Sequence, residues 1–477
     1  MNIYERNFWS LYFEFLEAFK ELKYRGFSIP YLCHFRSLNT DNMYIRTNLE
    51  SEEFIKYLTH EVKDKQTFQE LFSKYKQSHS NTKVSKTFKK MYNKKGKVVL
   101  YNAANLLRFP TDTIEKNFSS EETAFLHDVR PKKERLKKVR MGALPIYYLC
   151  DYKADVDEEI NKLKEKADRI ISNYNHHPMF NDVTFKQQFD KQIEGIVNRI
   201  EEAKNFIKDD LVSCFVFSST HYYQSRTIAM VAAEEGIPTI CMQHGIIASE
   251  LGYMPKIADV DAVYGNFEAN WFKKLGISEQ AVEVTGHPRF DTINNKISIS
   301  KQEFEEQLGL NPGKKTILIA VRGHAYVGKW KELIKSISKE GDFNIIVRDF
   351  PQSTPHKLTT LHPDVYPSKH FTLYELIHHS DAVVSYTSTV GLEAMIANKP
   401  TFILSTPTPT YIGYYDSLGE LAQTDPPKLA EVIKKYFNDK NMKEVVKNRR
   451  KDFLSHAYPS VKSSGERIVD LIKRLIN

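Results

Sequence analysis

Short apolar runs that end in polar or glycine-containing loops recur along most of this chain. One covers residues 211–217 and another covers residues 239–242. Between them, a helical pattern at about 222–235 is closed by Gly236. Strand, helix and strand with short connections predict a parallel pair in an open α/β sheet.

The same pattern predicts further strands in both halves of the chain. The first half adds residues 97–101 and 145–149, and the second half adds residues 316–321, 343–347, 382–385 and 401–404. In open α/β sheets, ligands sit at the carboxyl ends of strands, where these polar loops lie. The chain is therefore predicted to form two Rossmann-like halves facing each other across a cleft.

Two segments are predicted to be mainly helical additions. The apolar period in residues 1–95 favours packing on the domain beneath, because Glu14 and Glu17 suit an anionic membrane surface poorly. A second helical segment, at about 155–207, is highly charged. We expect a helical N-terminal region at 1–95, a first Rossmann-like domain at 96–292 with the helical insertion, and a second at 293–477.

The bulk composition narrows the class of protein. With 477 residues and 41% hydrophobic content, the chain should hold two or three domains. No apolar run reaches the ~18–20 residues of a membrane span, and the first residues lack a signal-peptide pattern. Widely spaced cysteines without a CxxC pair indicate a cytoplasmic protein with reduced thiols: Cys33, Cys150, Cys214 and Cys241.

The net charge of +8 is concentrated in two basic runs. Such runs attract membrane headgroups or phosphorylated substrates, and the open alternative is a solvated helix face. No nucleic-acid motif accompanies them, so we expect no nucleic acid as partner. The runs are Lys83, Lys86, Lys89, Lys90, Lys94, Lys95 and Lys97, and Arg130, Lys132, Lys133, Arg135, Lys137, Lys138 and Arg140.

The polar segment after the strand at 382–385 carries the sharpest chemical signal. Ser385 ends the strand, and Ser388 or Thr389 is placed to cap the next helix. A helix N-terminus binds phosphate well, and Glu393, one turn further, could reach the hydroxyls of a ribose. The alternative is an ordinary capped helix with Glu393 facing solvent.

A second candidate lies after the strand at 239–242. His244, between Gln243 and Gly245, stands where a general base of a cleft would lie. The alternative is a structural histidine that donates to a backbone carbonyl. His287 and Arg289 either line the cleft or hold the connection between the two halves.

Basic residues also follow the first two strands of the second half. Arg322, Gly323 and His324 form the first of these loops, and Arg348 begins the second. We predict that they bind phosphate groups, Arg348 in a bidentate manner.

No metal site is predicted. Asp259 and Asp261 form a DxD pair, but Asp261 is better explained as the start of a strand. The GxGxxG, GxxxxGK[ST] and HExxH motifs are absent from the sequence. Their absence argues against a dehydrogenase, a P-loop protein and a zincin metalloprotease.

Three segments resemble the GT-B transferases of bacterial surface polysaccharides, including capsule proteins and CDP-glycerol glycerophosphotransferases. They are AAEEGIP running into QHG at 232–245, VTGHPRFD at 284–291, and STVGLEA at 388–394 followed by Lys399-Pro400. Non-hydrolysing UDP-N-acetylglucosamine 2-epimerases look similar. The resemblance covers about residues 211–460. One departure is Arg348-Asp349-Phe350-Pro351, where relatives often carry a His-Pro pair.

The resemblance implies a GT-B-like fold, with acceptor binding in the first half and nucleotide-donor binding in the second. It implies a nucleotide-activated sugar as substrate, a glycan or lipid-linked acceptor, and no cofactor or required metal. We therefore expect an inverting glycosyltransferase of cell-envelope polysaccharide or glycoconjugate assembly, in the cytoplasm. The two basic runs add the hypothesis of a peripheral contact with an anionic membrane. Open alternatives are a CDP-glycerol-type glycerophosphotransferase, a UDP-N-acetylglucosamine 2-epimerase-like enzyme, and a non-catalytic scaffold.

Overall fold

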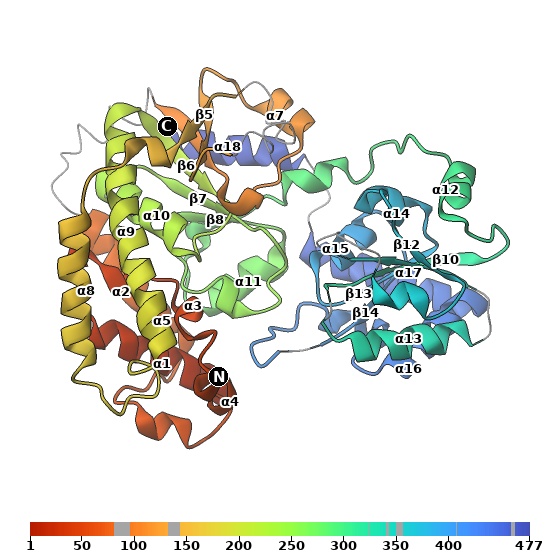
Figure 1. Ribbon diagram of the computed structural model, residues 1–477. Helices are drawn as coiled ribbons and strands as arrows, with labels where there is room; N and C mark the ends of the chain where they lie inside the picture. Colours follow the sequence, from red (N-terminus) through yellow and green to blue (C-terminus); the bar gives the residue numbers. More distant parts are fainter. Residues whose placement is uncertain are drawn as a thin grey trace.

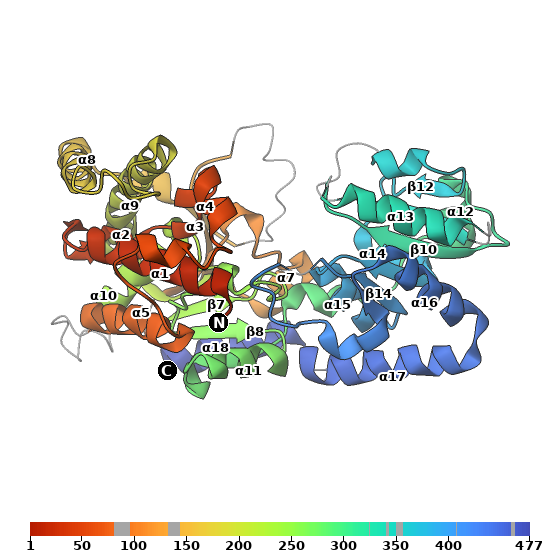
Figure 2. The same ribbon diagram turned by 90° about the horizontal axis from the view of Figure 1, so that it is seen from below.

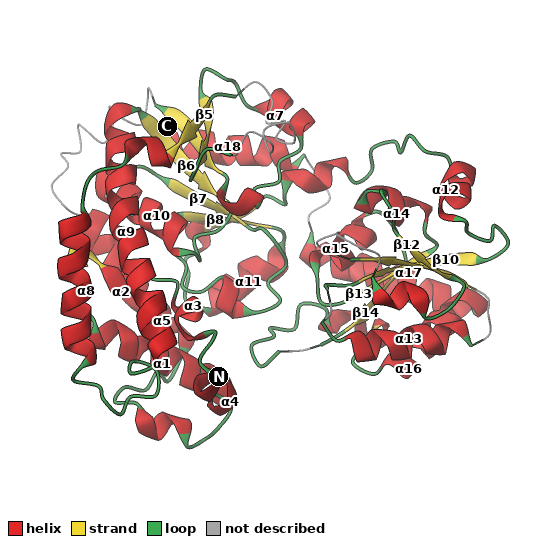
Figure 3. Ribbon diagram, in the orientation of Figure 1, coloured by secondary structure: helices red, strands yellow, loops and turns green. Residues whose placement is uncertain are grey.

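The computed structural model describes residues 1–80, 96–131, 144–323, 325–339, 343–349, 356–406, 408–458 and 463–477. Two α/β domains lie side by side, and each is a sheet flanked by helices (Figure 1, Figure 3). The first domain also carries the N-terminal helices. The predicted class, two Rossmann-like domains with helical N-terminal additions, is confirmed.

The first domain is built on a seven-stranded parallel sheet of order β5-β4-β3-β6-β7-β8-β9. The strand order reverses between β3 and β6, and ligands of such sheets bind where the order reverses. The strands are β3 Lys97–Tyr101, β4 Thr123–His127, β5 Ile146–Tyr148, β6 Val212–Phe217, β7 Thr239–Met242, β8 Val260–Val263 and β9 Val282–Val284.

Helices cover both faces of this sheet, which is why its central strands are apolar without alternation. All six residues of β6 are buried. Helix α10 ends at Gly236, whose φ of 72° lies in the left-handed region that favours glycine. The helices are α7 Thr111–Asn117, α8 Asp157–Ile171, α9 Val183–Asp209, α10 Tyr223–Glu235 and α11 Asn266–Lys274.

The second domain repeats the arrangement with six parallel strands of order β12-β11-β10-β13-β14-β15. The strands are β10 Lys315–Ala320, β11 Phe343–Arg348, β12 Val365–Pro367, β13 Ala382–Ser385, β14 Thr401–Leu404 and β15 Ala422–Gln423. The helices are α12 Lys301–Leu308, α13 Val327–Ser338, α14 Leu373–His379, α15 Thr389–Ile396, α16 Pro426–Asn438 and α17 Lys440–Ala457. Here the order reverses between β10 and β13.

The N-terminal region packs on the first domain, as its apolar period predicts. Trp9, Phe15 and Phe19 are at most 1% exposed and share one core with α9 and β6. Among the described residues, no helix is both long and apolar enough to cross a membrane. The elements are α1 Ile3–Ala18, β1 Lys23–Tyr24, β2 Phe27–Ser28, α2 Ile29–Leu32, α3 Phe35–Asn39, α4 Met43–Asn48 and α5 Lys65–Ser80.

The last helix returns to the first domain. Helix α18, Ser464–Ile476, buries Ile468 and Leu471 against β3 and β6, and Figure 2 shows it beneath β8. The sequence places these residues in the second half, 293–477. That assignment missed the return because an amphipathic helix does not indicate which sheet it covers.

Candidate functional site

The loop after β7 reaches from the first domain to the second. The backbone N–H of Ile246 donates to Thr389 Oγ1 at 3.2 Å, and the hydroxyls of Ser249 and Thr410 lie 2.6 Å apart. A Cβ on Gly245 would lie 3.5 Å from Thr389 Oγ1. Residues 243–249 therefore carry the predicted base of the first domain to the carboxyl edge of the second sheet.

Gln243 holds this loop in shape through its side-chain amide. Its amide nitrogen donates to the Gly245 carbonyl and to Glu268, each at 2.8 Å, and its amide oxygen accepts from the Tyr264 N–H at 2.8 Å. Burial raises the pKa of Glu268 to about 8, an effect that the hydrogen bond from Gln243 only partly offsets. Gln243 also lines a small cavity beside His244, so its predicted place at the cleft stays a prediction, while its amide group is used within the protein.

His244 lies where the sequence predicts, and its environment keeps it neutral. The imidazole stacks on Tyr253 with ring centroids 5.3 Å apart. Burial lowers the pKa of His244 to about 4; Arg108 and Arg289 act in the same direction, and a hydrogen bond with the Ser218 backbone opposes them. A neutral imidazole can accept a proton at ordinary pH.

Glu393 is the centre of an arginine cluster at the junction of the domains. Its Oε1 lies 3.4 Å from Arg289 Nε and 3.4 Å from the Tyr374 hydroxyl, and it is only 5% exposed. Burial raises the pKa of Glu393, while Arg289, Arg348 and Arg108 oppose this rise. Three guanidinium groups around one carboxylate leave an excess of positive charge, which suits an anionic ligand.

Arg348, like Arg289, has a guanidinium nitrogen that makes no hydrogen bond within the protein. Its Nε is buried without a hydrogen-bond partner, and burial lowers its pKa. A buried unpartnered donor is costly unless a ligand or water satisfies it. Phosphate binding by Arg348 stays a prediction, and the unpartnered nitrogen favours it because a phosphate oxygen could accept its hydrogen bond.

Sequence reasoning missed Arg108, which lies in the loop after β3. Arg108 and Asn105 have φ values of 50° and 55°, in the left-handed region that non-glycine residues rarely adopt. The Asn102 side chain accepts from the Leu107 N–H at 3.2 Å and holds the loop. Strained backbone of this kind clusters at functional sites. The available signal was an arginine in the loop after the first strand of the domain.

His287 and Asp291 hold the connection between the domains. His287 is 1% exposed, and its Nδ1 accepts from the Arg289 N–H at 3.2 Å. Asp291 accepts from the Ser463 hydroxyl and from two backbone N–H groups, those of Ser464 and Gly465. Of the two alternatives, His287 holds the connection, whereas Arg289 reaches the arginine cluster.

Helix α15 begins as predicted, with Ser388 as its N-cap. The Ser388 hydroxyl accepts from the Val390 N–H at 3.1 Å. Ser385 is fully buried, and its hydroxyl donates to the Tyr386 carbonyl, which makes a ligand contact through that hydroxyl unfavourable. Thr389 uses its hydroxyl to accept from the first domain.

The loop after β10 contributes to a pocket that residues of both domains line. Arg322 lines a cavity of about 390 Å³ together with Tyr386 and Thr387. The N–H of Gly323 donates to Asp349 Oδ1 at 2.7 Å. His324 lies outside the described residues, as do most residues of the two predicted basic runs.

The N-terminal helices support the wall of this cavity. Glu250, next to Ser249, is fully buried and accepts from Trp9 Nε1 at 3.0 Å and from Lys65 Nζ at 2.6 Å. Lys65 also contacts Glu5 at 2.8 Å. Helices α1 and α5 thereby fix the position of the loop that contacts the second domain.

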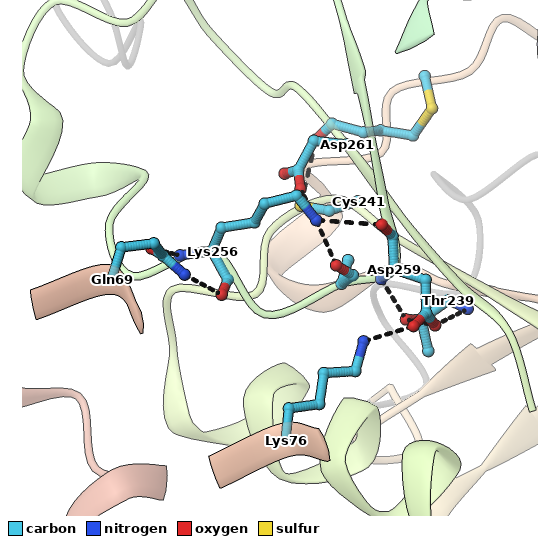
Figure 4. A network of polar contacts seen from close by, with 9 residues as sticks. Gln69, Lys76, Thr239, Cys241, Lys256, Asp259 and Asp261 are labelled. Atoms are coloured by element: carbon cyan, nitrogen blue, oxygen red, sulfur yellow. Dashed lines mark hydrogen bonds and ion pairs between the residues drawn. The ribbon is translucent and has the colours of Figure 1, made fainter. Parts of the chain in front are cut away.

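The DxD carboxylates are both paired with lysines (Figure 4). Asp259 accepts from Lys76 and from the Thr239 hydroxyl, each at 2.6 Å. Asp261 lies 2.9 Å from Lys256 Nζ. Within the described part of the chain, no group of three potential metal ligands is found. This network attaches α5 to β7 and β8.

Comparison with known proteins identifies the fold. No family model and no curated protein sequence matches the chain. A kitacinnamycin glycosyltransferase (TM-score 0.51, 11% identity) and UDP-GlcNAc 2-epimerase from Neisseria meningitidis bound to UDP-GlcNAc (0.51, 13%) each match over 80% of this chain and 99% of their own. An Anabaena protein in complex with UDP and glucose matches with TM-score 0.50 and 10% identity, over 80% of this chain and 100% of its own. The chain has the GT-B fold.

Proposed function

We propose that this protein is a glycosyltransferase of surface polysaccharide or glycoconjugate assembly. It moves a sugar from a nucleotide-activated donor to a hydroxyl of a glycan or lipid-linked acceptor. The observation that carries the proposal is the position of His244, which lies in the loop that contacts the second domain and close to the arginine cluster at the junction of the two domains. Two proteins that share the fold were solved with UDP-GlcNAc or with UDP and glucose.

In the proposed reaction, His244 accepts the proton of the acceptor hydroxyl. The acceptor oxygen bonds to the anomeric carbon while the bond from that carbon to the diphosphate oxygen breaks, which inverts the centre. Arg289 and Arg348 stabilise the charge that develops on the leaving diphosphate, so no metal is required for that task.

The donor nucleotide lies against the carboxyl edge of the second sheet. The N-terminus of α15, at Ser388 and Thr389, supplies backbone N–H groups and a favourable dipole for a phosphate. Glu393 accepts from ribose hydroxyls through its second oxygen while the first stays with Arg289 and Tyr374. This role is a hypothesis that the substitution below tests.

Thermal-shift measurements against UDP, CDP, GDP, dTDP and their sugar conjugates test the proposal. A ligand at a hundredfold excess over its Kd stabilises the folded state by about 2.7 kcal/mol. We expect one nucleotide to stabilise the wild type and to lose this effect in Glu393→Gln. The control is Glu431→Ala, which removes an exposed carboxylate of α16 in the same domain. A chain that no nucleotide stabilises would be a scaffold and not a transferase.

An epimerase is the second candidate, because the Neisseria structure with the same fold is a UDP-GlcNAc 2-epimerase. An epimerase needs no acceptor. Incubation with UDP-GlcNAc alone, followed by NMR of the sugar C2 proton, separates the two: turnover without an acceptor would replace the transferase proposal.

CDP-glycerol in the same panel tests a third alternative, a glycerophosphotransferase. In that reaction the acceptor hydroxyl would attack phosphorus instead of the anomeric carbon.

A further inference from the structure

The cavity of about 390 Å³ lies at the point where the second sheet reverses its strand order, and its lining residue Tyr386 interacts electrostatically with Arg348 of the arginine cluster. The loops after β10, β13 and β14 line it, and Trp330 of α13 contributes to its wall. The arginine cluster involves α14 and α15 instead, through Tyr374 and Glu393. A volume of several hundred Å³ is typical of small-molecule sites.

Two features show that the lining is prepared for a ligand. Tyr326, which lines the cavity, is 53% exposed and has φ 55° and ψ 30°, a left-handed conformation that bulky residues rarely adopt. Thr387 buries its hydroxyl oxygen without a hydrogen-bond partner. A buried hydroxyl without a partner in the protein is unfavourable and gains from a hydrogen bond to a ligand hydroxyl.

The cavity is also the place where both domains meet one ligand. Ala248 and Ser249 of the first domain line it together with residues of the second. The same loop, 243–249, carries His244 and is held to the second domain by the contact of Ile246 with Thr389. In a transfer between domains, the leaving nucleotide can stay on one domain, but the transferred group must face both.

We propose that this cavity holds the transferred group, a hexose-sized glycosyl unit without positive charge. The inference rests on the proposed function and extends it. Tyr326, Tyr386 and Tyr411 line the cavity and supply aromatic rings on which the C–H face of a sugar can pack, and the hydroxyl side chains of the lining can bond to its hydroxyls. Among the described lining residues Arg322 is the only charged one, so a cationic amino sugar finds repulsion and no carboxylate.

Thr387→Val tests the position of the glycosyl unit, because it removes a hydroxyl that has no partner in the unliganded protein. Calorimetry compares each nucleoside diphosphate with its sugar conjugate: UDP with UDP-glucose, GDP with GDP-mannose, dTDP with dTDP-glucose. We expect Thr387→Val to leave the diphosphate Kd unchanged and to weaken the conjugate about fivefold, the effect of one neutral hydrogen bond. Ser338→Ala is the matched control, since it removes a similarly unpartnered buried hydroxyl at the far end of α13.

The outcomes are separable. If Thr387→Val weakens a diphosphate and its conjugate equally, the cavity holds the nucleotide and the inference is wrong. If neither changes while wild type binds both, the glycosyl unit lies elsewhere. If the wild type binds no pair at all, the proposed function itself fails.

The charge requirement has its own test. Wild type should bind UDP-GlcNAc more tightly than UDP-glucosamine at a pH where the free amine is protonated, and Arg322→Gln should reduce this preference. Equal binding of the two conjugates by the wild type would overturn the exclusion of cationic sugars.

Discussion

At the scale of single residues, burial decides what each side chain can do. His244 and His287 are both histidines of the domain junction, yet only His244 lies in the loop that contacts the second domain. His287 is 1% exposed and holds the backbone of Arg289. Likewise, Gln243 and Ser385 lie at strand ends, but their polar side chains form hydrogen bonds to neighbouring backbone and side-chain atoms.

Replacing His244 by asparagine should remove the base and preserve most of the loop. We expect kcat to fall by ~10²–10⁴, the usual contribution of general-base catalysis, with little change in donor KM. Steady-state kinetics with the donor that the thermal-shift panel identifies would measure this. A loss of less than about threefold would exclude His244 as the base.

The pH profile provides an independent check on the same residue. Because burial lowers the pKa of His244 to about 4, the base stays neutral through the weakly acidic range. We expect kcat/KM to stay level as the pH falls through 6.5, the ordinary histidine value, and to decline only toward pH 4. An acidic limb near the ordinary value would show that His244 is not the titrating base.

At the scale of elements, polar contacts between distant segments set the arrangement of helices. Asp291 holds the start of α18, and the pair of Trp9 and Lys65 holds Glu250 beneath the loop that faces the second domain. Each contact joins residues far apart in the sequence. A periodic pattern of apolar residues reports only on neighbouring positions, so it cannot predict such contacts.

Asp291→Ala should detach the N-terminal turn of α18. The substitution removes the acceptor for three donors. We therefore expect the free energy of unfolding to fall by about 2 kcal/mol and hydrogen exchange in α18 to become faster. The comparison variant is Asp425→Ala, which removes the N-cap of α16, where the side chain accepts from one backbone N–H. Unchanged protection of α18 in Asp291→Ala would contradict this account.

Lys65→Met should destabilise the protein far more than a neighbouring lysine substitution. It leaves the fully buried Glu250 without its cation, and losing one partner of a buried pair costs about 3–5 kcal/mol. Lys74→Met, on the same helix, breaks only an exposed pair with Glu70 and should cost under about 0.5 kcal/mol. Denaturant unfolding measures both, and equal effects would show that the network is not a support.

At the scale of the whole molecule, the two domains face each other across loops from both carboxyl edges. The contacts between Ile246 and Thr389 and between Ser249 and Thr410 join them directly. Helix α18 adds a third connection by returning from the second domain to the first. The site therefore exists only in the assembled pair of domains.

The basic run at 83–97 is predicted to bring the whole protein into contact with an anionic membrane. We expect co-sedimentation with anionic vesicles at low salt, weakening as salt rises, and no binding to neutral vesicles. Replacing Lys89, Lys90 and Lys94 by glutamine should weaken binding, whereas the same change at Lys434 and Lys435 of α16 should not. Binding that ignores salt would exclude the electrostatic interaction.

The sequence by itself determined the local elements and the strand ends. Local signals mark these elements: short apolar runs for the strands, and the cap at Ser388 and the glycine at 236 for helix ends. Both parallel sheets and the position of His244 could therefore be predicted. The strands β4, β12 and β15 were not predicted, although other strands of three to five residues were.

Only the tertiary structure decided which polar groups stay available to a ligand. It joined Arg108 to Arg289 and Glu393, engaged Gln243 and Ser385 in internal contacts, and returned α18 to the first sheet. The physical reason is that a side chain's function depends on its burial and on partners contributed by distant segments. Neither of these is encoded in the local order of residues.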